Sequence, residues 1–363
     1  MTLEATLKKL IRFKTLSDDP KENRRALTWV RGQLRGLPLR TREFTISGFP
    51  ALVITTRRKK APTLWLQAHI DVVAAPAEAF RPKVTGQRLL GRGAHDMKFA
   101  IACYLKLLRN LGKTLPQYDF GVMLTSDEEI GGSISVKRLL NRGFRSRICF
   151  LPDGGKNFRF EQSAKAVLRL HVESHGTSAH GSRPWLGHNA IDELADFLQE
   201  LRTQFPKEPC GSRAHNHPSC NVGIIRGGHV ENQVPNYAEA MLDIRIPPNT
   251  AKSTVKSSVI SVARRFGHIT VTETAFEKGY IIDIDSPYLH AFKQAMRSEG
   301  IRVPRPLNAH GGSDARPFLE LGIPVILTRP RGGGSHGEKE WIDLPDLERF
   351  SRVLRSFVER VAQ

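Results

Sequence analysis

The 363-residue sequence is poor in cysteine and has no long hydrophobic run. Its four cysteines, Cys103, Cys149, Cys210 and Cys220, show no Cys-x-x-Cys spacing, which argues against both a disulfide framework and a thiolate zinc site. We therefore expect all four to be reduced. No stretch approaches the roughly 18 consecutive apolar residues of a membrane span, so the sequence does not predict a transmembrane segment.

The first residues also lack the features of a secretory signal. Residues 1–20 predict a short amphipathic helix that ends at a Ser/Asp/Pro stretch, without the apolar block and small-residue cleavage site of a signal peptide. We therefore expect a cytoplasmic protein.

Acidic residues are scarce relative to basic ones. The sequence has 55 Lys and Arg against 36 Asp and Glu, a formal net charge of +19. Such an excess fits a nucleic-acid partner, an anionic substrate or a surface that favours solubility. The basic residues are spread along the chain, as in TTRRKK and LNRGFRSR, and no zinc finger, RNP motif or basic arm accompanies them. This distribution favours a solvated surface over a nucleic-acid site.

The chain is longer than one hydrophobic core usually requires, so we expect two domains, or one domain with a large insertion. Apolar runs at 51–56, 64–70, 120–126 and 148–152 have the length of strands, and 97–112 has helical periodicity with Gly112 as its C-terminal cap. This alternation predicts an α/β fold with a mostly parallel sheet.

Between residues 165 and 275 the pattern changes to β-α-β-β-α-β, the order of the ferredoxin-like motif. The strands are expected at 166–174, 219–227, 238–246 and 269–276, and the helices at 189–205 and 251–266. The α/β pattern then resumes with a helix at 286–300 whose N-cap is Ser286, a strand at 324–328 and a last helix after Pro345. The sequence predicts a larger domain formed by 1–164 and 276–363, with 165–275 inserted.

Side chains that commonly bind metals lie at the ends of the predicted strands. In an open α/β sheet, ligands bind outside the carboxyl ends of the strands. The candidates there are His69 and Asp71 after 64–70, Asp127, Glu128 and Glu129 after 120–126, Asp153 after 148–152, Asp96 before the helix at 97–112, and His336 in the Gly-rich loop after 324–328.

Each candidate alone has an ordinary structural explanation: a hydrogen-bonded histidine, a helix N-cap or a turn. Together, two histidines and several carboxylates form a nitrogen and oxygen ligand set that suits zinc, cobalt or manganese. One metal needs about four ligands, whereas this set fills two sites if one carboxylate bridges them. Two divalent cations would also offset the repulsion among the adjacent carboxylates at 127–129.

The sequence resembles the di-zinc metallopeptidases that include aminoacylase, carboxypeptidase G, acetylornithine deacetylase and succinyl-diaminopimelate desuccinylase. The resemblance covers nearly the whole chain. It implies that the inserted unit is the family's lid and dimerisation domain, and that the protein is a homodimer. The motifs that carry it, in the family's order, are HIDVV, GRGAHDMK, SDEEIGG, HGTSAHGSRPWLGHNAI, NQVPNYAEAMLDIR, GGSDARPF and GGGSHGEKEW.

The resemblance also implies a metal-ligand set. His69 and Asp153 would hold one zinc, Glu129 and His336 would hold the other, and Asp96 would bridge the two. The same motifs assign the remaining site residues. Asp71 would orient the imidazole of His69, Glu128 would be the general base, His180 would stabilise the oxyanion in the partner subunit's site, and the substrate contacts would be Asn232, Arg245, Gly312, Ser313 and Arg316.

The chain departs from the family pattern at two places near the bridging residue. Phe99 and Ala100 stand where the family often has two glycines, so the packing of that helix is expected to differ. His95 stands where a small or hydroxyl residue is common, and we expect it to face away from the metals. Neither departure removes a ligand.

We therefore expect a metal-dependent hydrolase that cleaves an amide bond of a small carboxylate-bearing substrate, through a water activated by two metals and a glutamate base. The sequence leaves open whether the protein is an exopeptidase, an N-acyl amino acid deacylase or a desuccinylase. Without the motif match, Arg245 would be interpreted as half of a salt bridge. An alternative of another class is an inactive scaffold or nucleic-acid-associated protein that uses the basic surface.

Overall fold

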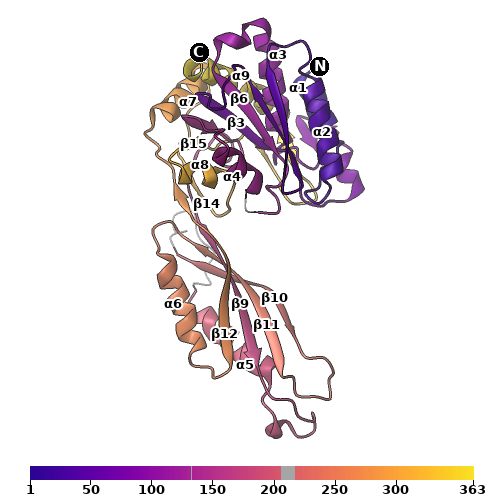
Figure 1. The fold of residues 1–363 in the computed structure, drawn as a ribbon, viewed down its shortest axis with the longest axis vertical. Coiled ribbons are helices and arrows are strands. Elements are labelled where there is room, and N and C mark those ends of the chain that lie inside the picture. Colours follow the sequence, from indigo (N-terminus) through magenta and orange to yellow (C-terminus); the bar gives the residue numbers. More distant parts are fainter. Residues whose placement is uncertain (132, 206–216) are drawn as a thin grey trace. The chain divides into compact units, whose positions relative to one another are not determined.

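The computed structural model describes residues 1–131, 133–205 and 217–363, and the chain forms two compact units. The first contains Met1–Gln162, Ile282–Ala309 and Ser313–Gln363, and the second contains Ser163–Ile281 and His310–Gly312 (Figure 1). The second unit is thus inserted into the chain of the first, and the range expected as an insertion, 165–275, lies within it. The two units are described in turn.

A six-stranded sheet forms the centre of the first unit. Its strands lie in the order β1 (Arg40–Ile46), β2 (Phe49–Thr55), β6 (Phe120–Thr125), β3 (Leu64–His69), β7 (Ile148–Phe150) and β15 (Val325–Ile326). The neighbours β6 and β3, β3 and β7, and β7 and β15 are parallel, whereas β2 runs antiparallel to both β1 and β6. A mostly parallel sheet with an antiparallel hairpin at one edge confirms the predicted α/β class.

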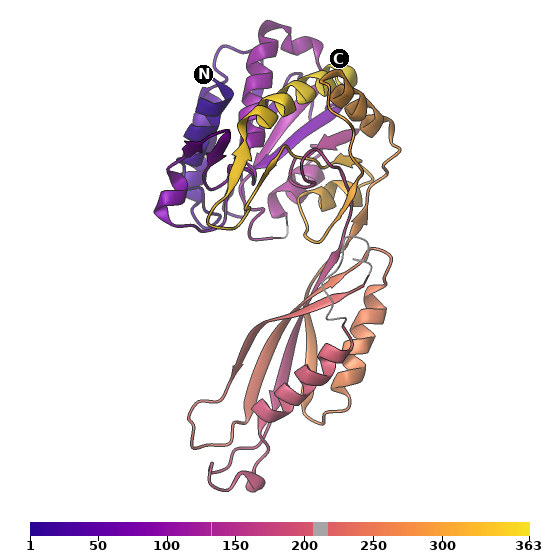
Figure 2. The ribbon, with the colours of Figure 1, turned by 180° about the vertical axis from the view of Figure 1, so that it is seen from behind.

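Helices cover both faces of this sheet. The chain passes from β3 through α3 (Lys98–Leu111) to β6, and then through α4 (Ile134–Asn141) across β3 to β7. These right-handed crossovers run in opposite directions along the sheet and therefore place α3 and α4 on opposite faces, as Figures 1 and 2 show from the two sides. The other helices of the unit are α1 (Leu3–Ile11), α2 (Pro20–Gly32), α7 (Pro287–Ser298), α8 (Ala315–Glu320) and α9 (Leu344–Val361).

Aromatic side chains hold β7 against these helices. Phe150 of β7 stacks on Phe292 of α7 with ring centroids 5.2 Å apart, and it contacts Phe350 and Phe357 of α9 at 6.0 and 5.8 Å. Phe99, at the start of α3, meets Phe350 edge to face at 5.6 Å. Because all five rings are fully buried, they fix the elements whose ends carry the candidate ligands.

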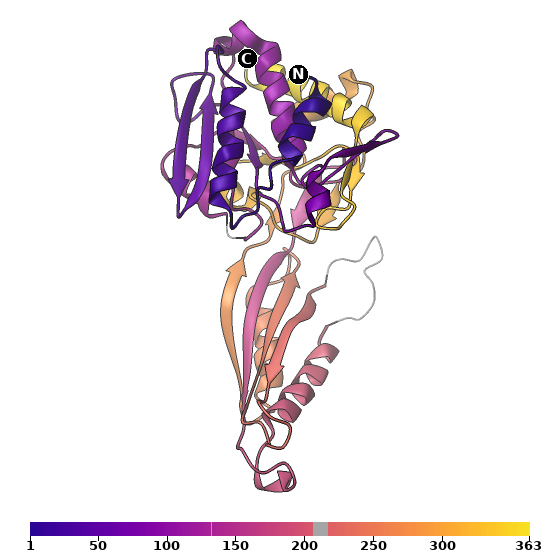
Figure 3. The ribbon, with the colours of Figure 1, turned by 90° about the vertical axis from the view of Figure 1, so that its right-hand side faces the viewer.

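The second unit has the predicted β-α-β-β-α-β order. Its elements are β9 (Ala166–His175), α5 (Ala190–Thr203), β10 (Ser219–Gly227), β11 (Tyr237–Ile246), α6 (Lys252–Ala263) and β12 (Ile269–Glu277). The strands form an antiparallel sheet in the order β10-β11-β9-β12. Figure 3 shows α5 and α6 on the same face of this sheet, where their apolar residues form one core with the strands. The fold is therefore ferredoxin-like, as predicted.

Small sheets join more distant segments. β4 (Lys83–Thr85) and β5 (Arg88–Leu90) pair with β17 (Trp341–Asp343) and β16 (Gly332–Gly333) in the order β16-β17-β5-β4, which brings the segment before α3 beside the segment before α9. In the second unit, β13 (Tyr280–Ile281) pairs antiparallel with β8 (Glu161–Ala164), and β14 (Leu307–Ala309) is a short strand of the first unit. Short 3-10 helices cover Ala77–Phe80, Gly112–Gln117 and Pro184–Leu186.

Two sequence expectations concern single features of the fold. Among the described helices, none has the length and apolar character needed to cross a membrane. Cys103, Cys149 and Cys220 are free thiols, and Cys210 lies outside the described residues.

Candidate metal centre

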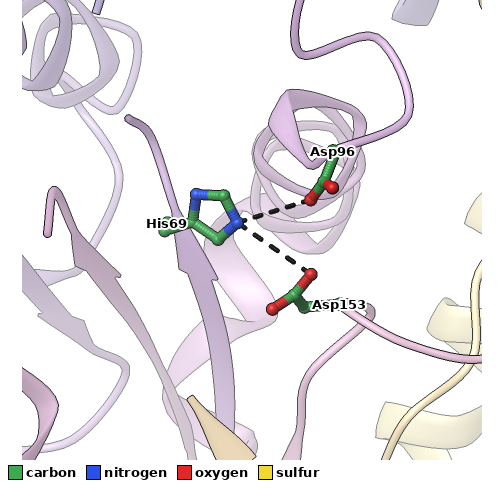
Figure 4. Close-up of side chains that lie close together, drawn as sticks. All are labelled: His69, Asp96 and Asp153. Carbon is green, nitrogen blue, oxygen red and sulfur yellow. Dashed lines mark ion pairs between the residues drawn. The ribbon is translucent and has the colours of Figure 1, made fainter. Parts of the chain in front are cut away.

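The candidate ligands meet at the carboxyl ends of β3, β6 and β7, next to the point where the chain reverses its direction along the sheet. His69 is the last residue of β3 and its side chain is fully buried. Its Nε2 atom lies 3.5 Å from Oδ1 of Asp96 and 4.0 Å from Oδ1 of Asp153, which follows β7 (Figure 4). These three side chains face one another although they come from three separate segments.

A second group shares Asp96 with the first. Nε2 of His336 lies 3.0 Å from Oε2 of Glu129 and 3.5 Å from Oδ2 of Asp96. The two carboxylate oxygens of Asp96 therefore face different histidines, since Oδ1 is the atom nearest His69. A carboxylate in this position is suited to bridge two cations.

The chemistry of both groups fits divalent metals. In each group, the three ligand atoms lie within 4.8 Å of one another. Nε2 of His69 and Oδ2 of Asp153 are buried and have no hydrogen-bond partner among the residues described, although buried polar atoms are normally paired. Imidazole nitrogen and carboxylate oxygen are ligands that zinc, manganese and cobalt accept.

Protons compete with cations at this centre. Burial, together with repulsion from Glu128 and Asp96, raises the pKa of Asp153 well above its usual value. Burial acts on Asp96 too, but the nearby histidines His336 and His69 outweigh it and hold the pKa of Asp96 well below its usual value. Hydrogen bonds to Asp96 and Glu129 raise the pKa of His336 to about 10. The site thus favours positive charge, and cations that bind there would replace protons.

Asp71 fixes the orientation of His69. Nδ1 of His69 lies 3.0 Å from the backbone oxygen of Asp71 and 3.5 Å from its Oδ1. Because a carbonyl oxygen only accepts, Nδ1 carries a hydrogen, and Nε2 is the ring nitrogen oriented toward the metal centre. The other carboxylate oxygen of Asp71 accepts hydrogen bonds from the hydroxyl of Ser17, at 2.7 Å, and from the backbone of Glu129, at 3.1 Å.

The two other residues of the acidic run have separate surroundings. Asp127 is buried and accepts a hydrogen bond of 2.8 Å from the backbone of Ser135, in the first turn of α4. Glu128 places Oε2 4.0 Å from Nε2 of His69, and its side chain is 17% exposed. Burial raises the pKa of Glu128 well above its usual value. Asp127 therefore has a structural contact, whereas Glu128 lies at the metal centre without belonging to either three-residue group.

The proposed substrate contacts lie in both units. Ser313 and Arg316 belong to the first unit and are 4% and 9% exposed. Gly312, Asn232 and His180 are exposed residues of the second unit. Arg245, also in the second unit, makes a two-bond contact with Asp243, at 2.6 Å from Nε and 3.1 Å from Nη2.

Two residues at the centre were not identified from the sequence. Nη1 of Arg329 lies 4.0 Å from Oδ2 of Asp96. Glu340 is 2% exposed and accepts hydrogen bonds from the backbone of the loop that carries Asp96. The sequence offered one signal for both residues, their position close to His336 in the loop after a predicted strand. His95, by contrast, belongs to neither three-residue group.

Comparisons with known proteins identify the family of the chain. Residues 65–360 match the model of peptidase family M20/M25/M40. A Probable carboxypeptidase from Paracoccidioides lutzii is 28% identical over 327 residues, which cover 82% of this chain and 71% of the relative. A succinyl-diaminopimelate desuccinylase from Halorhodospira halophila is 26% identical over 323 residues, which cover 82% of each chain.

Solved structures share the fold. A tripeptidase from Staphylococcus aureus superposes with a TM-score of 0.79 at 19% identity, covering 99% of this chain and 97% of the other. A dinuclear metal binding peptidase of family M20 from Bacillus subtilis superposes with a TM-score of 0.68 at 14% identity, covering 99% and 97%. Since the family match extends over most of the chain, and histidines and carboxylates of metal-binding type converge inside the matched range, the chain belongs to peptidase family M20/M25/M40, a family of metal-dependent hydrolases.

Proposed function

We propose that the protein hydrolyses an amide bond of a small carboxylate-bearing substrate, an N-acyl amino acid or a short peptide, with two divalent cations, zinc or else cobalt or manganese. The observation that carries this proposal is the pair of three-residue groups that share Asp96. In the proposed site, His69 and Asp153 hold one cation, Glu129 and His336 hold the other, and Asp96 contacts both. When bound, such cations polarise a carbonyl and make a water acidic enough to attack it at neutral pH.

Glu128 is the proposed general base. Its carboxylate lies beside the two groups without belonging to either, so it remains available for proton transfer. Burial raises its pKa, which brings the group closer to the operating range of a general base. Glu128 would accept a proton from the attacking water and donate it to the amine that leaves.

His180 supplies a donor from the second unit. Its Nδ1 lies 3.1 Å from the backbone nitrogen and 2.8 Å from the hydroxyl of Ser182. The backbone N–H can only donate, so Nδ1 accepts and the hydrogen of the neutral ring is on Nε2. We propose that this N–H stabilises the oxyanion of the tetrahedral intermediate, in the active site of the partner subunit.

A homodimer through the second unit is part of the proposal. β10 lies at the edge of its sheet, and Ile224 and Ile225 on this strand are 44% and 57% exposed. Trp185 and Leu186, in the loop that follows His180, are 74% and 62% exposed. An edge strand with exposed apolar side chains is typical of a surface that associates with another chain.

Arg245 and Asn232 are the proposed contacts for the substrate carboxylate, with Gly312, Ser313 and Arg316 in a substrate loop. The bidentate face of the Arg245 guanidinium is occupied by Asp243, and Nη1 lies 3.4 Å from the backbone oxygen of His310. A substrate carboxylate would therefore compete with Asp243 for this guanidinium, so we expect recognition of the carboxylate to contribute specificity more than affinity.

Metal analysis combined with a substrate panel tests the proposal. We expect about two cations per chain in the purified protein, and hydrolysis of acetylated, succinylated or dipeptide substrates that stops with a chelator and returns with zinc or cobalt. Which substrates are cleaved distinguishes a deacylase or desuccinylase from an exopeptidase. A protein that binds no metal, or whose amidase activity survives complete chelation, would contradict the proposal.

A further inference from the structure

A buried carboxylate outside the two ligand groups, Glu340, contacts the loop that carries Asp96. One carboxylate oxygen of Glu340 accepts hydrogen bonds from the backbone of His95, at 2.8 Å, and of Asp96, at 2.9 Å. The other accepts from the backbone of Gly93 and from Nη1 of Arg92, both at 2.9 Å. Glu340 and Arg92 are 2% and 3% exposed, so three backbone N–H groups and one ion pair meet at a carboxylate shielded from solvent.

These contacts connect the two loops that supply ligands to one cation. Glu340 accepts hydrogen bonds from the backbone of the loop that contains Asp96. His336 lies four residues before Glu340, in the other loop. Arg92 reinforces the connection, since its Nη2 donates to the backbone oxygen of Gly337 at 3.1 Å. Glu340 and His95, which this network joins, are 245 positions apart in the sequence.

His95 connects the same loops at a second point. Its Nδ1 lies 3.0 Å from the hydroxyl of Ser335, the residue before His336, and its ring stacks on Phe99 with centroids 6.4 Å apart. The opposite loop has no room for a larger residue at Gly332, because a Cβ there would lie 2.3 Å from Cδ2 of His95. The two departures from the family pattern, His95 and Phe99, thus contact each other.

We propose that Glu340 and the His95–Ser335 pair are positioning residues that fix Asp96 relative to His336 and thereby set the affinity of the cation held by Asp96, Glu129 and His336. This inference rests on the proposed metal centre. We call the contacts of Glu340 and of the His95–Ser335 pair the loop clamp. Glu340, His95 and Ser335 belong to neither of the two ligand groups.

The loop clamp acts more on one cation than on the other. His336 is 57% exposed and has a left-handed backbone, with φ of 63°, so the core does not hold its ring and the loop alone places it. His69 and Asp153, which complete the other group, lie at the ends of β3 and β7, whose positions the sheet fixes. Loosening the loop clamp therefore separates Asp96 from His336 more than it disturbs His69 and Asp153.

Calorimetric titration of the metal-free full-length protein with cobalt tests this inference. In Glu340→Gln, an amide NH2 group replaces one carboxylate oxygen. This group cannot accept the two hydrogen bonds that the oxygen accepts in the wild type. We expect the weaker of the two cobalt affinities to fall about 10- to 100-fold, as for other residues that orient metal ligands, while the tighter one changes by less than about twofold. Glu338→Gln is the matched control: Glu338 is an exposed residue of the same loop, so both affinities should stay at the wild-type values.

Two further variants identify the affected site and guard against misfolding. His336→Ala should retain one cobalt, and adding Glu340→Gln to it should change that affinity by less than about twofold, because the clamped ligand is already absent. Ser335→Ala removes one contact of the loop clamp without touching Glu340. It should lower the affinity for the same cobalt ion about threefold, which is the order of the loss expected for one hydrogen bond. If Glu340→Gln does not fold, this variant tests the inference in its place.

The outcomes are distinguishable. If wild type binds two cobalt ions and Glu340→Gln binds both unchanged, the inference is wrong and the proposed function stands. If both affinities fall together, or the metal-free variant melts at a clearly lower temperature with both affinities reduced, Glu340 supports the fold in general and the inference is again wrong. A wild-type protein that binds no cobalt overturns the proposed function and the inference with it.

Discussion

Neighbouring residues of the acidic run have different roles because their side chains reach different surroundings. Asp127 accepts a backbone hydrogen bond at the start of α4, Glu129 faces His336, and Glu128 lies 4.0 Å from the nearest nitrogen of His69. The same chemical group therefore serves as a helix cap, a proposed ligand and a proposed base. Environment, and not residue type, assigns the three functions.

The proposed base can be separated from the ligands by substitution. Glu128→Gln keeps the size of the side chain and removes its basic oxygen, so we expect kcat to fall about 100- to 10,000-fold while about two metals per chain remain bound. Turnover with a saturating substrate and metal content by atomic emission are the measurements. The adjacent Asp127→Asn serves as control, because its amide oxygen still accepts the Ser135 N–H and turnover should persist. Equal loss of metal and of turnover in Glu128→Gln would show that Glu128 is a ligand.

Most of the candidate ligands could be predicted because they sit at strand ends. His69 and Asp153 directly follow or close apolar runs, and the topology of the sheet brings such positions together. Arg329 and Glu340 were not predicted, since each was seen only as a charged residue in a glycine-rich loop. The contact of Glu340 with the His95 backbone spans 245 positions, and no local pattern encodes it.

At the scale of helices and strands, the sequence patterns predicted the elements that are rich in apolar residues and the helices that have a clear N-cap residue. β10 covers 219–227 as predicted, and Ser286 caps α7 by accepting the N–H of Leu289. The Ser/Asp/Pro stretch that was expected to end the first helix instead begins the second, because Asp19 accepts the N–H of Glu22 and α2 starts at Pro20. The polar helix α2 and the largely exposed strand β1 were missed, since few apolar residues mark their periodicity.

One carboxylate ties the starts of two neighbouring strands together. Asp119, just before β6, accepts hydrogen bonds from the backbone of Thr63, at 3.1 Å, and from its hydroxyl, at 2.7 Å, just before β3. Lys59 lies 2.5 Å from the same oxygen. Although burial opposes ionisation, the hydrogen bonds from Lys59 and Thr63 lower the pKa of Asp119. This carboxylate is more acidic in the folded protein than in the unfolded chain, so its ionisation stabilises the fold.

The pH dependence of unfolding tests this contact. A lowered folded pKa contributes stability above the ordinary carboxyl value of about 4, and the contribution is lost as the pH falls through the folded value. We expect Asp119→Asn to lower the free energy of unfolding by about 1 to 3 kcal/mol at pH 7, and by progressively less below pH of about 4. Urea unfolding, followed by circular dichroism at neutral pH and again in the acidic range below the ordinary carboxyl pKa, measures this change in the free energy of unfolding. Asp18→Asn, at an exposed position, is the control; an equal deficit for Asp119→Asn at both pH values would contradict the assignment.

At the scale of the whole molecule, the β-α-β-β-α-β order was predictable because its strands alternate in burial. β11 alternates between buried and partly exposed residues along its whole length, as expected for a sheet with helices on one face only. The isoleucines of β10 break that alternation, since the consecutive residues Ile224 and Ile225 are 44% and 57% exposed. The exposed side chains of this edge strand, like those of Trp185 and Leu186, fit the proposed contact with a second copy of this chain.

Mixing two inactive variants tests whether that second copy completes the active site. His180→Ala removes the proposed oxyanion donor, and we expect kcat to fall about 100- to 1,000-fold with metal content unchanged. Glu128→Gln removes the base from the same chain's first unit. If His180 acts in the partner, a mixed dimer has one site with an intact Glu128 and an intact His180, and one site that lacks both.

Random exchange makes about half of the dimers mixed, so an equal mixture should recover about a quarter of wild-type turnover, because only one of their two sites is complete. If His180 acts within its own chain, each site of every dimer lacks one group, and the mixture should show no more than the average of the two variants. The measurement is turnover after co-unfolding and refolding, or co-expression, with size-exclusion chromatography to verify the dimer. Recovery requires both a dimer and a shared site, so it cannot arise from stability alone.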